Sequence, residues 1–210
     1  MARPRIFVLA GVNGAGKSSI GGAALQRIGL DWFNPDTFTR HLVETTGSPL
    51  ADANAAAWHE GVRRLDAAIA QRSHHAFETT LGGNTIAARL RQAAASHDIL
   101  MWFCGLDTPE HHIARVNFRV RQGGHDIPEA KVRERYIASI RNLIGLLPHL
   151  AQLQVFDNSA DAAPGTPIAD PCLLLQMERG RITHPTLVED LFHMPDWARP
   201  IMEVALSMQA

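Results

Sequence analysis

The sequence predicts an α/β fold, with a mainly parallel sheet of five to six strands flanked by helices, because short apolar runs alternate with segments of helical periodicity. Residues 6–10 form a continuous apolar run that ends at Gly11, as expected of a strand buried on both faces. Comparable runs at residues 75–79, 98–105 and 153–156 predict three further strands. This alternation favours parallel strands joined by helical crossovers.

Helix signals fill the segments between these runs. We expect a helix over residues 17–28, and a short strand at residues 31–34 before a helix that opens at Pro35-Asp36-Thr37. Asp52 is the predicted N-cap of the alanine-rich helix that follows. The predicted buried stripe of that helix consists of Trp58, Val62, Leu65 and Ile69.

The second half of the chain continues the pattern and ends differently. Helices are expected at residues 85–96, at 109–122, and from Pro128 to about residue 147. Residues 173–177 and 181–183 then flank Glu178-Arg179-Gly180, which predicts a β-hairpin. The tail after residue 185 is expected to be mostly helical, so the last segment, about residues 172–210, combines a hairpin with a helical tail.

Composition limits the class of protein. The 210 residues, 46% of them hydrophobic, suffice for one domain over residues 1–210, and the net charge of −1 argues against a nucleic-acid partner. Cys104 and Cys172 fit neither a disulfide framework nor a zinc site, which favours a reducing cytoplasm. We expect no signal peptide and no membrane partner. The adjacent pairs His74-His75 and His111-His112 are expected to be surface histidines.

A phosphate-binding loop follows the first strand. Its pattern, Gly-x4-Gly-Lys-Ser, runs from Gly11 to Ser18 between a predicted strand and a predicted helix. Glycine lets backbone N–H groups turn toward phosphate oxygens, and the helix start favours an anion. Lys17 is expected to reach the β- and γ-phosphates of ATP, and the Ser18 hydroxyl to bind Mg²⁺. The predicted ATP-binding residues of the loop are Gly11, Asn13, Gly14, Ala15, Gly16, Lys17, Ser18 and Ser19.

Two carboxylates lie where an acceptor hydroxyl is expected. No guanine-selecting Asn-Lys-x-Asp motif occurs, which argues against a GTPase and favours a small-molecule kinase. Asp36 follows the second predicted strand, where a general base for the hydroxyl is expected, although it could instead cap the next helix. Glu78 lies at the end of the third predicted strand, beside Thr79 and Thr80. These three residues and Arg135 are the candidate substrate ligands. The alternative is that Glu78 is a charge exposed to solvent at the end of the strand.

Positive charge is concentrated between residues 110 and 148, a segment that we call the lid. Two helices rich in arginine are joined there by Gly123-Gly124, an arrangement suited to closing over a phosphate. At least one of Arg115, Arg119, Arg121 and Arg135 is expected to contact phosphate, with Arg115 and Arg119 as catalytic candidates and Arg121 with His125 as ATP ligands. A solvated charged face is the alternative explanation for the other basic residues of the lid.

Taken together, these motifs resemble the zeta toxin family of P-loop kinases. The matching segments run in order from residue 6 to residue 159. They are the phosphate loop, Asn34-Pro35-Asp36, Phe77-Glu78-Thr79-Thr80, the lid segment from Ala114 to Pro128, Arg135-Tyr136, Asn142-Leu143 and Phe156-Asp157-Asn158-Ser159.

The resemblance implies a P-loop kinase fold and transfer of the γ-phosphoryl of ATP to UDP-N-acetylglucosamine. It implies that Asp36 is the general base, that Glu78 and Thr80 contact substrate, and that Arg115 with a further lid residue stabilises the transferring group. It also implies a helical antitoxin that blocks the ATP site. Two alternatives stay open: a kinase of another metabolite or an antibiotic, with a housekeeping or resistance role, and an ATP-dependent regulatory or nucleic-acid-binding protein.

Overall fold

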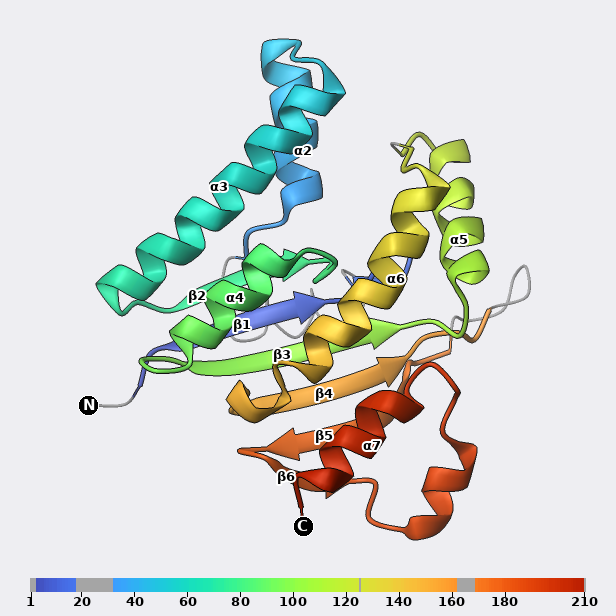
Figure 1. Ribbon diagram of the computed structural model, residues 1–210. Coiled ribbons are helices and arrows are strands. Elements are labelled where there is room, and N and C mark those ends of the chain that lie inside the picture. Colours follow the sequence, from blue (N-terminus) through green and yellow to red (C-terminus); the bar gives the residue numbers. More distant parts are fainter. Residues whose placement is uncertain (1–2, 18–31, 125, 162–168, 210) are drawn as a thin grey trace.

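A six-stranded sheet forms the centre of the computed structural model, which describes residues 3–17, 32–124, 126–161 and 169–209 (Figure 1). The strand order is β2-β1-β3-β4-β5-β6. β1 to β4 are parallel, whereas β5 and β6 are antiparallel to their neighbours. The strands are β1 (Arg5–Ala10), β2 (His75–Thr79), β3 (Asp98–Gly105), β4 (Gln152–Asp157), β5 (Cys172–Glu178) and β6 (Arg181–His184). The predicted α/β fold is therefore confirmed.

The central strand brings the carboxyl ends of its neighbours to one edge of the sheet. In register, Ala10 of β1 lies opposite Thr79 of β2 and Phe103 of β3. Ile6, Val8 and Ala10 are completely buried, as the continuous apolar run predicts. The phosphate loop and the segments that follow β2, β3 and β4 therefore all leave the sheet at the same edge.

Helices cover the sheet and rise beyond it (Figure 1). α4, α6 and α7 pack on one face, where their apolar residues join those of the strands in the main core. α2 packs against α3 to form a helical hairpin, and α5 packs against the lid part of α6. The helices are α2 (Pro35–Thr46), α3 (Leu50–Gln71), α4 (Asn84–Ala93), α5 (Pro109–Arg121), α6 (Glu129–Ile144) and α7 (Arg199–Ser207), with 3₁₀ turns at Leu147–His149 and Val188–His193.

The predicted strand at residues 31–34 is wrong for the residues of it that the structure describes. Of residues 32–34, only Phe33 forms a bridge, parallel to Phe77 at the free edge of β2. Its backbone N–H donates to Ala76 and its carbonyl accepts from Glu78. Asn34 then leaves the sheet because it caps α2, whose first residue is Pro35. One residue of pairing is thus all that this segment provides.

Two helix starts also differ from the sequence prediction. α3 begins at Leu50 after Pro49, so Asp52 lies in the first turn and does not cap the helix. Pro128 is the capping residue that precedes α6 and lies outside the first turn. The β5–β6 hairpin is confirmed, with Arg179 and Gly180 at positive φ in its turn. The predicted helix at 17–28 lies mostly outside the described residues. No helix in the part of the chain that is described has the length and apolar character to cross a membrane.

Candidate active site

The phosphate loop leaves β1 in a backbone conformation that depends on its glycines. Gly11, Gly14 and Gly16 have φ values of 137°, 85° and 80°, which L-residues with side chains rarely adopt. A Cβ on Gly11 would lie 2.2 Å from the carbonyl oxygen of Cys104. The loop is therefore packed directly against the end of β3, and the glycine spacing of the motif has a steric cause.

Three side chains from distant parts of the sequence hold the loop in this conformation. Buried His112 contributes its Nδ1, which donates to the carbonyl of Asn13 over 2.9 Å. Arg135 donates from Nη1 to Asn13 Oδ1 at 2.8 Å, and Asn158 donates from Nδ2 to the carbonyl of Ala15 at 2.9 Å. All three contacts use oxygen atoms of the loop as acceptors, so they do not occupy the backbone N–H groups that a phosphate-binding turn presents to its ligand. Two of these N–H groups donate within the protein, from Gly11 to Thr79 and from Ala15 to Val12.

His112 contradicts the expectation of a surface histidine. Its side chain is completely buried, and burial lowers its pKa to about 4. Because Nδ1 carries the proton donated to Asn13, the ring is the neutral Nδ1–H tautomer. His112 therefore supports the loop without adding charge to it.

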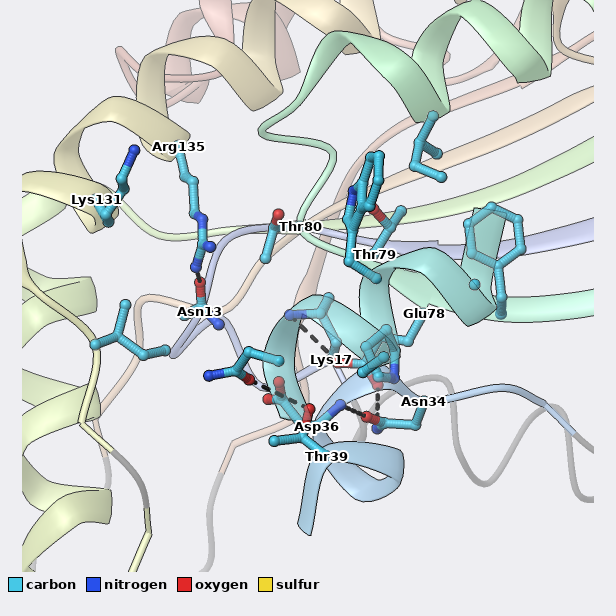
Figure 2. Close-up of a pocket in the computed structure, with 18 of the residues that line it drawn as sticks. Asn13, Lys17, Asn34, Asp36, Thr39, Glu78, Thr79, Thr80, Lys131 and Arg135 are labelled. Atoms are coloured by element: carbon cyan, nitrogen blue, oxygen red, sulfur yellow. Dashed lines mark hydrogen bonds and ion pairs between the residues drawn. The ribbon is translucent and has the colours of Figure 1, made fainter. Parts of the chain in front are cut away.

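Lys17 and Glu78 form a buried ion pair below the loop. The Lys17 Nζ lies 3.4 Å from Glu78 Oε1, and their side chains are only 8% and 9% exposed. Glu78 also accepts from Asn34 Nδ2 over 2.9 Å (Figure 2). The solvated alternative for Glu78 is thus wrong, because the carboxylate is buried between the loop lysine and the residue that caps α2.

Asp36 lies in the first turn of α2, so the alternative that Asp36 itself caps this helix is wrong. Asn34 Oδ1 accepts from the backbone N–H groups of Asp36 and Thr37 at 2.8 and 3.2 Å, so Asn34 is the cap. The Asp36 carboxylate is 38% exposed, and its Oδ2 lies 3.8 Å from Arg119 Nη1. Lys17, Glu78, Asn34 and Asp36 thus form one connected set of contacts, which Figure 2 shows.

A cavity of about 300 Å³ lies between the α2–α3 hairpin and the lid. Its walls combine a mostly apolar floor with polar groups from both sides. Lys17, Asp36, Glu78, Thr79, Thr80 and Arg135 line it together with Asn13, Phe33, Asn34, Pro35, Thr39, Asn54, Ala57, Trp58, Gly61, Phe77, Ile86, Asp126, Ile127, Pro128 and Lys131 (Figure 2). The structure therefore brings the predicted loop lysine, both carboxylates and both threonines to one cavity.

The lid arginines differ in their surroundings. Arg115 binds Asp161 from Nη2 over 2.8 Å, and this hydrogen bond, with one from His111, lowers the pKa of the Asp161 carboxyl. Arg119 reaches Asp36, and its buried Nε and Nη2 have no hydrogen-bond partner among the residues that the structure describes. Arg121 is exposed and stacks over Phe118.

Arg135 lies at the wall of the cavity. Burial lowers the pKa of its guanidinium, and the negative charge of Asp36 partly offsets this effect. A Cβ on Gly82 would lie 2.6 Å from the Arg135 stem, so the loop after β2 fixes this side chain. Of the four arginines, only Arg135 lines the cavity, whereas Arg119 reaches the edge of it through Asp36.

Some predicted site residues lie outside the described part of the chain, and some residues that support the site were not predicted. Ser18, Ser19 and His125, predicted to bind ATP and, for Ser18, Mg²⁺, lie outside the described residues. The supports Asn34, His112 and Asn158 had no role from sequence reasoning, although Asn34 and Asn158 lie in segments that carried the family resemblance. Trp58 was predicted to be buried; it is 47% exposed and lines the cavity.

Comparison with known sequences identifies neither a family nor a function for this chain. No protein-family model matches the chain. A protein from Haemophilus influenzae with no stated function is 28% identical over 152 residues, which cover 65% of this chain and all of the relative.

Solved structures show where the fold occurs. The structure of AvrRxo1-ORF1 with AvrRxo1-ORF2 and ATP superposes with a TM-score of 0.67 at 15% identity, covering 97% of this chain. This chain spans only 64% of that longer one. A chain of the PezAT chromosomal toxin–antitoxin system of Streptococcus pneumoniae gives a TM-score of 0.59 at 13% identity, with 100% and 87% of the two chains covered. The chain therefore has the α/β fold of P-loop kinases, similar to that of these two proteins.

Proposed function

We propose that this protein is an ATP- and Mg²⁺-dependent kinase that phosphorylates a hydroxyl group of a small molecule, and that the acceptor is UDP-N-acetylglucosamine. One observation carries the proposal: the loop lysine and Asp36 face one cavity and are joined through Glu78 and Asn34. Phosphoryl transfer needs positioning and charge stabilisation more than covalent catalysis, and this connection positions the two groups relative to each other.

The residues present suit a bound triphosphate. Gly14 and Gly16 let the loop pack closely on its supports, since a Cβ there would lie 2.8 Å from the His112 carbonyl and 2.4 Å from Asn158 Nδ2. Two buried nitrogen atoms of Arg119, Nε and Nη2, make no hydrogen bond to the described part of the chain, which suits an oxyanion. ATP supplies the phosphoryl group when bound, and Mg²⁺ is expected at Ser18. Lys17 then exchanges part of its contact with Glu78 for phosphate oxygens.

Asp36 acts on the acceptor. Its carboxylate takes the proton of the hydroxyl as the oxygen–phosphorus bond forms and the bond to the leaving diphosphate breaks. Arg119, whose Nη1 lies 3.8 Å from Asp36 Oδ2, would turn toward the transferred group and so release Asp36 to serve as base. Thr79, Thr80 and Arg135 orient the acceptor from the opposite wall.

The test is transfer from ATP to UDP-N-acetylglucosamine, followed by mass spectrometry of the nucleotide sugar. Asp36→Asn should reduce transfer by about 10²- to 10⁴-fold while the ATP dissociation constant, measured by calorimetry, stays the same. Transfer at the wild-type rate by Asp36→Asn would exclude Asp36 as the base. If the wild type binds ATP but leaves UDP-N-acetylglucosamine unmodified, incubation with a metabolite extract tests other hydroxyl acceptors, including antibiotics.

We also propose a toxin role with a neutralising protein partner. The support is the fold shared with a chain of the PezAT toxin–antitoxin system of S. pneumoniae and with the structure of AvrRxo1-ORF1 bound to AvrRxo1-ORF2. Expression of the wild type should then arrest bacterial growth, and Lys17→Ala should relieve the arrest. Normal growth on expression of the wild type would contradict the toxin role and leave the kinase proposal standing.

A further inference from the structure

One face of α3 borders the candidate acceptor cavity with an unusual set of residues. Asn54, Ala57, Trp58 and Gly61 follow one another at i, i+3, i+4 and i+7, so they form a single stripe, and all four line the cavity. Ala57 is buried, whereas Trp58 is 47% exposed. A stripe that combines an amide, a tryptophan and two small residues is not the uniformly apolar stripe that core packing favours.

The small residues of the stripe bring the helix close to the aromatic floor of the cavity. A Cβ on Gly61 would lie only 3.0 Å from Phe33 Cε1. Phe33 and Phe77, which both line the cavity, pair through the bridge at the edge of β2. The wall opposite the lid is therefore smooth and apolar beside Trp58, a shape that accepts the face of a ring.

Asn54 is held with its amide oriented. Thr39, only 3% exposed, donates from Oγ1 to Asn54 Oδ1 over 3.2 Å. The Nδ2 group of Asn54 makes no hydrogen bond within the ranges that the structure describes, and so its two N–H groups are available to a ligand oxygen. An aromatic face next to a fixed amide donor presents an apolar and a polar surface to the same ligand.

We propose that Asn54 and Trp58 form the subsite for the ring that bears the acceptor hydroxyl, and that this ring is a sugar. The assignment rests on the proposed kinase function, because Asp36 identifies the cavity as the acceptor site. A volume of about 300 Å³ is at the lower end of ligand pockets, which span roughly 300–1,000 Å³, so the cavity holds one ring and not a whole nucleotide.

The chemistry of the two side chains selects a sugar over a nucleobase. The ring beside Trp58 must place a hydroxyl at Asp36 within the same small cavity, and a base has none to offer. A pyranose stacks its C–H face on the indole and turns its hydroxyl oxygens toward the Asn54 amide. Lys131 and Arg135, on the lid wall, then face whatever charged group the sugar carries outside the cavity.

Steady-state kinetics tests the subsite with UDP-N-acetylglucosamine as acceptor. Trp58→Ala should raise the KM for the acceptor by at least about tenfold and leave kcat within about threefold, with ATP affinity unchanged; Trp58→Phe should restore most of the loss. Asn54→Ala should raise the same KM. The matched controls are Phe192→Ala and Asn117→Ala, which remove an exposed aromatic and an exposed amide outside the cavity. Equal KM values for Trp58→Ala and Phe192→Ala would overturn the subsite.

A binding measurement separates this inference from the kinase proposal. Saturation-transfer NMR on Asp36→Asn, in which transfer should be strongly reduced, follows N-acetylglucosamine and uridine as separate probes. We expect transfer to the sugar ring protons that disappears in Asp36→Asn/Trp58→Ala but not in Asp36→Asn/Phe192→Ala. Transfer to the uridine base alone, lost with Trp58, would overturn the sugar assignment. Sugar binding without any kinase activity in the wild type would instead refute the proposed function and retain the subsite.

Discussion

Acidification should destabilise this protein through His112. The ring is fully buried, its Nδ1 donates to the Asn13 carbonyl, and its buried Nε2 has no hydrogen-bond partner in the described ranges. Burial lowers the pKa from the ordinary 6.5 to about 4, and the positive charges of Lys17 and Arg115 act in the same direction. The folded protein therefore resists protonation of His112, whereas the unfolded chain accepts the proton freely.

The magnitude follows from linkage. Between pH 7 and pH 5 the histidine of the unfolded state, with a pKa of 6.5, becomes protonated, while the folded one, at about 4, stays neutral. The unfolded state binds more protons in this window, so the free energy of unfolding falls with pH, by about 2 kcal/mol from this residue. The stabilisation that the protein gains by keeping His112 neutral is thus fully present above about pH 6.5 and is lost as the pH falls toward 4.

Urea unfolding at pH 7 and pH 5 measures this effect in wild type and in His112→Asn. The asparagine amide can replace the Nδ1 donor but cannot titrate, so the wild type should lose about 2 kcal/mol more than the variant between the two pH values. His75, whose pKa burial also lowers to about 4, is present in both proteins and cancels in the difference. Equal losses in the two proteins would refute the assignment of a neutral buried ring.

Two further substitutions test the supports of the phosphate loop. Asn158→Ala removes the hydrogen bond to the Ala15 carbonyl, so the affinity for ATP, measured by calorimetry, should fall roughly threefold to tenfold. The control Asn117→Ala, on the exposed side of α5, should leave the affinity unchanged. Equal affinities of the two variants would show that the hydrogen bond is dispensable. Gly11→Ala forces a methyl group against the Cys104 carbonyl, whereas Gly47→Ala, at a φ of 68°, meets nothing within 4 Å. Gly11→Ala should therefore cost at least about 2 kcal/mol more in urea unfolding than Gly47→Ala, and similar costs would contradict the close packing of the loop on β3.

The elements that the sequence predicts best are those whose structure is determined by residues adjacent to one another in the chain. The strands β1 to β4, the hairpin and the glycine loop all carry local patterns, namely apolar runs bounded by turn residues, and the structure has them at nearly the predicted positions. The prediction of a strand at residues 31–34 was wrong because Asn34 leaves the sheet after Phe33 to cap α2. The apolar pair Trp32-Phe33 shows hydrophobicity but does not show how long the pairing lasts.

Supports that act across the fold left little local signal. His112 and Asn158 contact the loop from 99 and 143 residues away in the chain, and only tertiary packing brings them there. Trp58 has the spacing of a buried stripe, but α3 extends past the edge of the sheet, so this part of the helix borders the cavity (Figure 1). Periodicity identifies a helix face and leaves open whether the core or a ligand covers it.

The distribution of these supports has a consequence for biosynthesis. The phosphate loop is synthesised before the residues that support it, because Cys104, His112, Arg135 and Asn158 contact it from β3, α5, α6 and the segment after β4. A nascent chain that has reached β2 contains the loop sequence without any of these contacts. Translation must pass Asn158 before the loop has all of these contacts, so we expect truncated products that end before Asn158 to hold the loop less firmly.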